Sequence, residues 1–70
     1  MELTIEIERE TDGRWLAEVL ELAGVMAYGA DRAEAVARVQ ALALQVLADK
    51  LEHGELAPVP SVTFSQLEAA

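Results

Sequence analysis

The sequence predicts an α+β fold of order β-β-β-α-β, in which an antiparallel sheet of three strands plus a short fourth carries one long helix on one face. Three observations predict this fold. Residues 3–8 alternate between apolar and polar side chains, as a half-buried strand does. Asp12-Gly13 is a hairpin signal that precedes a second such stretch. Residues 32–53 repeat apolar side chains at helical spacing, and Gly54 follows as a helix stop.

The first two strands form a hairpin whose loop length follows from the pairing of apolar residues. A three-residue loop, Thr11-Asp12-Gly13, places Ile7 opposite Ala17. A two-residue loop would instead place Ile7 opposite Glu18. Because a shift of one residue moves every side chain to the other face, the apolar pairing favours the longer loop. Gly13 is then expected in the left-handed conformation of a bulge.

The stretch from Gly24 to Ala35 is predicted to be a short buried strand that runs into the helix. Residues 25–28 are largely apolar, which is typical of a strand covered on both faces. Gly29 is expected to free the backbone to turn. Asp31 is a good N-cap, and Glu34 three residues later completes a variant of the capping box.

The helix has more apolar surface than one small sheet can cover. Its apolar arc spans roughly 200°, about twice the width needed to face a sheet. The residues expected to face the sheet are Val39, Leu42, Ala43 and Val46. The residues that would then be left in water are Leu44, Leu47 and Leu51. We therefore expect the protein to bind itself, as a homodimer or homotetramer.

After the helix, two prolines at positions 58 and 60 favour an extended linker. Residues 61–64 then contain β-branched and aromatic side chains and predict a short fourth strand at a sheet edge. The remaining residues are too few for a second domain, so one domain over residues 1–70 is expected.

Thirteen acidic against five basic residues give a formal net charge of −8 at pH 7. This charge repels phosphate and favours a basic protein partner, so we expect no direct binding of nucleic acid. The chain has no cysteine, which excludes disulfides and thiolate metal sites. No signal peptide and no membrane span is recognisable, so a cytoplasmic protein that binds no membrane is expected.

No group of residues indicates a catalytic or cofactor site. His53 is expected to act as a cation at the helix C-terminus. A carboxylate cluster of Glu2, Glu6, Glu8 and Glu18 could hold a metal, but a solvated strand face is the favoured interpretation, and we expect no metal. The less favoured alternative is an RNase H-like, metal-dependent nuclease, which would need carboxylates that converge on paired metals.

Local residues along the chain together resemble the N-terminal domain of HicB-type antitoxins. The stretches that carry the resemblance are DGRW at 12–15, ELAG at 21–24 and GADRAEA at 29–35. The second is similar to the family's "pelpG" turn and the third to its "GdTxeEA" helix start. The sequence departs from the family pattern at Leu20, Ala23, Ala30 and Asp31.

The resemblance implies a single HicB-like domain, similar to a double-stranded-RNA-binding or truncated RNase H-like arrangement. Proteins of this kind are not enzymes: they bind a small basic ribonuclease toxin, cover its active site and assemble as dimers or tetramers. Full-length members usually add a C-terminal DNA-binding domain, for which these 70 residues leave no room. An orphan homo-oligomeric assembly module without a toxin partner is therefore the alternative. The expected partner or oligomer contacts are Glu6, Glu8, Leu16, Glu18, Leu20, Leu44, Leu47 and Leu51.

Overall fold

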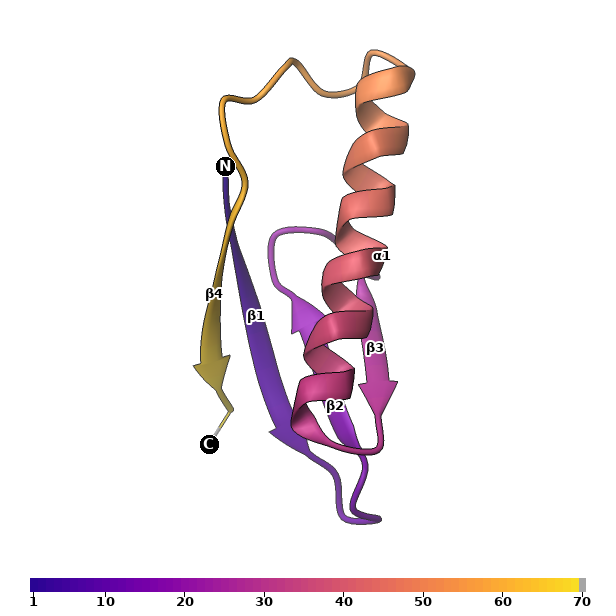
Figure 1. The fold of residues 1–70 in the computed structure, drawn as a ribbon, viewed down its shortest axis with the longest axis vertical. Helices are drawn as coiled ribbons and strands as arrows, with labels where there is room; N and C mark the ends of the chain where they lie inside the picture. The colour runs from indigo at the N-terminus through magenta and orange to yellow at the C-terminus, as the bar shows by residue number, and fades with distance from the viewer. Residues whose placement is uncertain (70) are drawn as a thin grey trace.

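The computed structural model describes residues 1–69 and has the predicted order of elements (Figure 1). Strands β1 (Glu2–Arg9), β2 (Trp15–Val19) and β3 (Met26–Gly29) precede helix α1 (Arg32–Glu52), and β4 (Thr63–Glu68) follows it. The strand order in the sheet is β3-β2-β1-β4. Strand β2 is antiparallel to both β1 and β3, whereas β4 runs parallel to β1. The α+β class is confirmed, and the sheet is a mixed one.

The β1–β2 hairpin has the predicted register. Ile7 pairs with Ala17. The N–H of Glu10 donates to the carbonyl of Arg14 at 2.7 Å, which closes a three-residue loop between them. Gly13 in this loop has a φ of 91°, the left-handed conformation that glycine adopts at little cost. The loop therefore sets which side chains of the two strands face the core.

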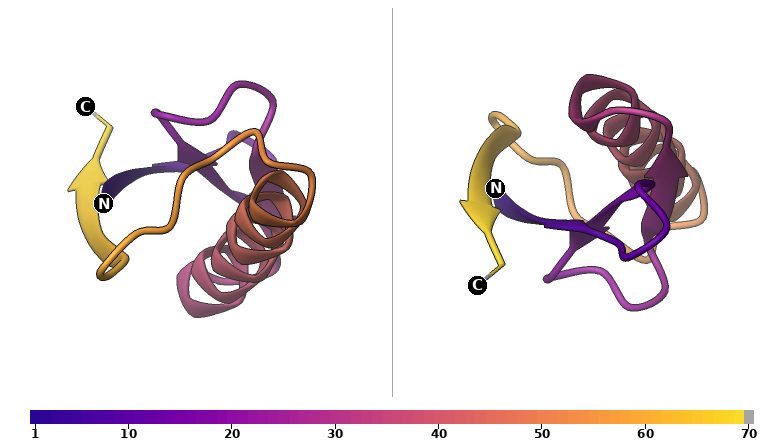
Figure 2. Two further views of the ribbon diagram at one scale, coloured as in Figure 1. Left: turned by 90° about the horizontal axis from the view of Figure 1, so that it is seen from above. Right: turned by 90° about the horizontal axis from the view of Figure 1, so that it is seen from below.

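The hydrophobic core lies between α1 and one face of the sheet. The helix lies toward the β3 end of the sheet, with β4 at the far edge (Figure 2). The buried residues of the core are Leu3, Ile5, Ile7, Ala17, Val19, Val25, Ala35, Val39, Ala43 and Leu47. Within the described residues, no helix combines the length and apolarity needed to cross a membrane.

The prediction that Leu47 is left in water is wrong, because only 4% of this residue is exposed. The buried stripe of α1 takes every fourth residue from Ala35 to Leu47. Four residues turn an α-helix by about 400°, so such a stripe drifts by about 40° at each step. The drift brings Leu47 over the sheet and leaves Leu42 and Val46 only half-buried.

The prediction that β3 is covered on both faces is also wrong. Val25, just before the strand, is buried and Ala27 is half-buried, but Met26 and Tyr28 are exposed. The strand lies at an edge of the sheet, and α1 covers only one of its faces. An apolar strand of this kind leaves every second side chain on an uncovered surface.

Gly29 has a different role from the one expected. The glycines with positive φ among the described residues are Gly13, Gly24 and Gly54, so Gly29 is not needed for a left-handed turn. A Cβ atom on Gly29 would instead lie 2.4 Å from the backbone nitrogen of Ala35. Glycine at this position allows the end of β3 and the first turn of α1 to touch.

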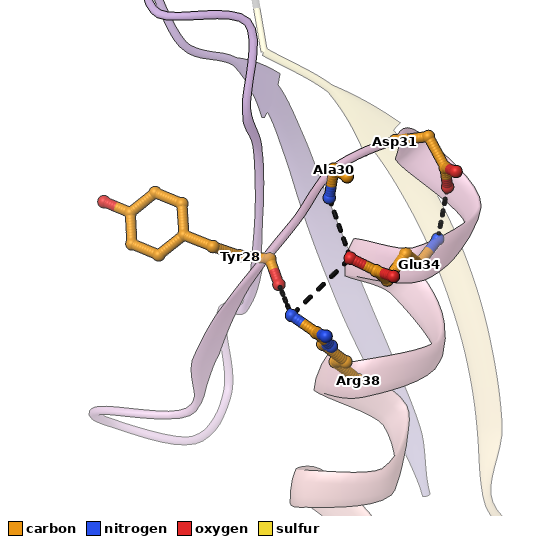
Figure 3. Close-up of polar contacts among 5 residues, drawn as sticks. All are labelled: Tyr28, Ala30, Asp31, Glu34 and Arg38. Atoms are coloured by element: carbon orange, nitrogen blue, oxygen red, sulfur yellow. Dashed lines mark hydrogen bonds and ion pairs between the residues drawn. The ribbon is translucent and has the colours of Figure 1, made fainter.

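The start of α1 is capped as predicted, with one difference in detail (Figure 3). The N–H of Glu34 donates to Asp31 Oδ1 at 2.8 Å, as in a capping box. The Glu34 carboxylate accepts from the N–H of Ala30 at 2.8 Å, one residue before the N-cap. Arg38 donates to the carbonyl of Tyr28 at 3.1 Å and lies 3.6 Å from Glu34, which joins the helix to the end of β3.

Strand β4 lies at a sheet edge as predicted, but it is longer and begins later than residues 61–64. The amino group of Met1 donates to the carbonyl of Ser61 at 2.7 Å, just before the strand. Arg32, at the start of α1, donates to Gln66 at 3.3 Å and forms an ion pair with Glu68. The last strand is therefore held by β1 and by the first turn of the helix.

Candidate functional site

The sheet face opposite α1 is the main surface on which the predicted contact residues gather. Side chains alternate between the two faces of a strand, so the residues between the core positions point to this side. Its larger side chains, which we call the open face, are Glu6, Glu8, Leu16, Glu18, Leu20, Met26, Tyr28 and Leu67. The contact residues predicted on β1, on β2 and just after β2 therefore share one surface.

The strand register places acidic and apolar side chains of the open face next to one another in rows. The first row across the sheet consists of Met26, Glu18, Glu6 and Leu67. The second row consists of Tyr28, Leu16 and Glu8. Two carboxylates thus lie at the centre of the first row, with an apolar side chain at each end. Met26 is 44% exposed and Leu67 is 50% exposed.

Glu6 and Glu18 are like charges at directly opposite positions of two antiparallel strands. The Cβ atoms of such a pair lie about 4.5–5.5 Å apart, and like charges in this arrangement destabilise a sheet. Both residues are half-buried, and neither takes part in an ion pair with another described residue. A cation placed between the two carboxylates would relieve their repulsion.

Arg14 lies over Tyr28 of the open face, and it already has partners. Its guanidinium lies 4.3 Å from the centre of the Tyr28 ring. Its Nε lies 2.7 Å from Asp12 Oδ2. The backbone N–H of Arg14 also donates to Asp12 Oδ1 at 3.0 Å. This backbone hydrogen bond and, after it, the side-chain hydrogen bond lower the pKa of Asp12. Arg14 therefore covers the tyrosine at one end of the second row and leaves the glutamate pair uncompensated.

Glu21 fastens the loop after β2 to β1 at the edge of the open face. Its carboxylate accepts from the Thr4 N–H at 2.7 Å and from Thr4 Oγ1 at 2.8 Å. These two hydrogen bonds lower the pKa of Glu21 below its ordinary value, and the bond from the backbone N–H of Thr4 has the larger effect. The N–H of Leu20 also donates to the Thr4 carbonyl, at 3.0 Å, so Leu20 is held at this edge.

We expect Glu21→Gln to lower the urea midpoint at pH 7 and to leave it unchanged in strong acid. The pKa of Glu21 in the folded state lies below its ordinary value, so the carboxylate stabilises the fold fully above the ordinary pKa and loses this effect as the pH falls through the folded-state pKa. Glutamine keeps an acceptor oxygen but loses the charge that strengthens both hydrogen bonds. Urea titrations of both proteins from pH 7 downward test this. A midpoint difference that is the same at every pH would contradict it.

The contact residues predicted on the helix do not stay together. Leu47 belongs to the core, as described above. Leu44 is 49% exposed and Leu51 is 41% exposed, and both lie on α1, across the sheet from the open face. The structure thus separates the predicted contacts into two surfaces, one on the sheet and one on the helix.

A group of potential metal ligands lies at the end of α1, in residues that the sequence did not bring together. One ligand atom each from Asp49, His53 and Glu55 falls within 4.8 Å of the others, and all three residues are exposed. His53 is the C-cap, with Nδ1 2.8 Å from the Asp49 carbonyl, so it lies at the helix end as expected. Among the described residues, the glutamates of the open face do not converge in this way.

Met26, Tyr28 and Leu67 are the open-face residues that sequence reasoning missed. Met26 and Tyr28 lie in an apolar run that fits both a covered and an uncovered strand, so their outward position had no local signal. Leu67 had none either, because its place beside Glu6 depends on the parallel pairing of β4 with β1.

No family model, curated protein or solved structure matches this chain. The likeness to HicB-type antitoxins rests on the sequence stretches quoted above.

Proposed function

We propose that the chain is a non-enzymatic, HicB-like interaction protein whose open face binds a small basic protein. The partner that we favour is a ribonuclease toxin. The observation that carries the proposal is the opposed pair Glu6 and Glu18 between Met26 and Leu67. An arginine or lysine of the partner would insert between the two carboxylates. Apolar side chains around that cation would pack on the ends of the row.

The charge of the protein fits this kind of partner. A net charge of −8 attracts a basic protein over a distance and speeds the encounter, while the open face supplies the short-range contacts. Hydrogen bonds between a guanidinium and a carboxylate are about twice as strong as those between neutral groups. An acidic surface over the basic groove of a ribonuclease would exclude RNA from it, and this inhibition needs no chemical step.

The order of the helix and strands supports the HicB-like proposal. The observed order β-β-β-α-β is the one that the sequence resemblance implies. Strand β4 beside β1 also extends the open face by Leu67, so the complete sheet contributes to the proposed surface. Assignment to the double-stranded-RNA-binding-like or truncated RNase H-like arrangement is part of the proposal.

The proposal is tested by reversing the charge of the central pair. We expect the tagged protein to retain a small basic protein from its host lysate in equal molar amount, and the variant Glu6→Lys with Glu18→Lys to lose it. Two charge-assisted contacts of about 1.5 kcal/mol each correspond to binding weaker by about 100-fold. The matched control is Glu52→Lys with Glu55→Lys, which changes the net charge equally at exposed positions away from the open face.

The captured protein must also cleave RNA and must be inhibited by the wild-type chain. Capture that survives in the open-face variant but fails in the control would contradict the proposed surface. Capture with unchanged RNA cleavage would contradict the antitoxin role while leaving a partner-binding role.

A second candidate function is the orphan assembly module, which the exposed leucines of α1 favour. Leu44 and Leu51 lie on a helix and not on the open face, so they have no place in the toxin contact. Recovery of the tagged protein alone, as a defined homo-oligomer, would favour this candidate over the antitoxin.

A further inference from the structure

One side of α1 has no ionisable side chain along nearly the whole helix. At 100° per residue, its members fall within a sector about 120° wide. We call this surface the neutral flank, and its residues are Ala33, Val36, Ala37, Gln40, Leu44, Ala48 and Leu51. Charged side chains make up 26% of the sequence, so a neutral stripe along a surface helix is a distinct feature of this chain. It marks a surface built for contact with another neutral surface.

The neutral flank forms one wall of a groove beside β4. The groove has a volume of about 510 Å³ and is lined by Arg32, Ala33, Val36, Ala37, Gln40 and Gln66. In the described residues, the helix packs against β3, β2 and β1, and its backbone does not reach β4 (Figures 1 and 2). The layer above the sheet is therefore only partly filled by α1, and space for a second helix remains next to it.

We infer that a second copy of this chain docks here, with the two α1 helices antiparallel along their neutral flanks. This inference deepens the second candidate function, which rests on Leu44 and Leu51, and it does not depend on the toxin-binding proposal, which uses the opposite face of the sheet. Two copies with a net charge of −8 each repel one another, so they can approach closely only through surface without acidic groups. A strongly basic partner would gain no charge contacts from the neutral flank and would bind elsewhere.

The charges at the two ends of α1 favour the antiparallel direction. The first two turns of the helix hold two arginines and one glutamate, whereas the last two turns hold two acidic residues and one lysine. In an antiparallel pair, the two arginines of one helix, each with an acidic neighbour in its own chain, lie beside the net negative last turns of the other helix. The helix dipoles are also opposed in this arrangement, and a parallel pair would place like ends together.

The sizes of the side chains also match across a two-fold axis near position 42. Antiparallel pairing about that point places Ala33 of one copy opposite Leu51 of the other, and Val36 opposite Ala48. In both of these pairs a small residue faces a large one, as interlocking helix surfaces require, and nearest the axis Gln40 of one copy lies opposite Leu44 of the other. The same patch serves both copies, which is the closed two-fold arrangement commonest among soluble oligomers.

The first test is the mass of the protein in solution. We expect wild type to have twice its monomer mass of 7.6 kDa by light scattering at micromolar concentration, and Leu44→Glu to be a monomer with unchanged circular dichroism. The matched control is Leu20→Glu, a leucine of nearly equal exposure on the open face, which should remain a dimer. A wild-type monomer, or a dimer broken by the control and not by Leu44→Glu, would overturn the inference.

A second test determines the direction of the helices, since the natural chain has no cysteine. The double variant Ala33→Cys with Leu51→Cys should form a disulfide-linked dimer on oxidation. Ala33→Cys alone should not, because the two copies of position 33 would be separated by 18 residues, roughly 27 Å along the helices. Efficient cross-linking by the single variant would overturn the antiparallel arrangement.

Discussion

Replacing Gly29 by alanine is expected to destabilise the protein by about 3 kcal/mol or more, a value at or above the upper end of the usual range for overpacked sites. The added Cβ would lie 2.4 Å from the nitrogen and 2.9 Å from the Cα of Ala35. Both are backbone atoms, so no side-chain rotation can make room. Ala35 is itself fully buried in the core, and Gly29 is paired with Trp15 in the sheet. The helix would have to move away from the strand to which it is packed.

A loss of this size would be a large fraction of the total stability. Small domains are stable by about 5–15 kcal/mol, and a chain of this length is expected near the lower limit. Urea denaturation followed by circular dichroism would measure the effect. The matched control is Gly24→Ala, where no atom lies within 4 Å of the new Cβ and the cost of about 1–2 kcal/mol comes only from the φ of 78°. Equal losses in the two variants would show that close packing at Gly29 is not the cause.

The parts of the fold that the sequence predicted correctly are those determined by neighbours along the chain. The hairpin register follows from alternation within each strand and from three loop residues that place Ile7 opposite Ala17. The helix start follows from Asp31 and Glu34, whose hydrogen bond spans a single turn. In both cases the competing arrangement would have exposed an apolar side chain or left a helix N–H without an acceptor.

The parts that sequence reasoning missed depend on distant contacts. An apolar run such as residues 25–28 fits both a covered and an uncovered strand, and only the position of α1 shows that Met26 and Tyr28 face outward. The row of the open face is complete only when Leu67 lies beside Glu6, through strands far apart in the sequence. The acidic and apolar residues of β1 and β2 were thus foreseen, and the ends of the rows were not.

The helix residues show a related limit. A broad apolar arc does not state which part of it meets the sheet, because the drift of the buried stripe depends on how the helix axis crosses the strands. The prediction therefore placed Leu47 in water and placed Leu42 and Val46, at the other side of the arc, against the sheet. This exchange matters for experiment, since a double substitution of Leu44 and Leu47 would disrupt the core together with the proposed interface.

Leu47→Ala is expected to cost about 2–5 kcal/mol, as large-to-small substitutions at buried leucines do. Leu47 is 4% exposed and belongs to the core cluster that joins α1 to the sheet. Leu44→Ala, one turn away and 49% exposed, removes the same atoms from the surface of the protomer. Its effect on a monomer is expected within about 0.5 kcal/mol. Urea titrations at low protein concentration, where association contributes least, provide the comparison.

Protein concentration then separates a core residue from an interface residue on the same helix. Dimerisation stabilises the folded state by mass action, so the wild-type midpoint should rise with concentration. Leu47→Ala should lower the midpoint at every concentration, because the core is lost in monomer and dimer alike. Leu44→Ala should match wild type when dilute and fall below it when concentrated. If the midpoint of Leu44→Ala instead follows that of wild type at all concentrations, Leu44 lies outside any interface and the exposed leucine has no role in assembly.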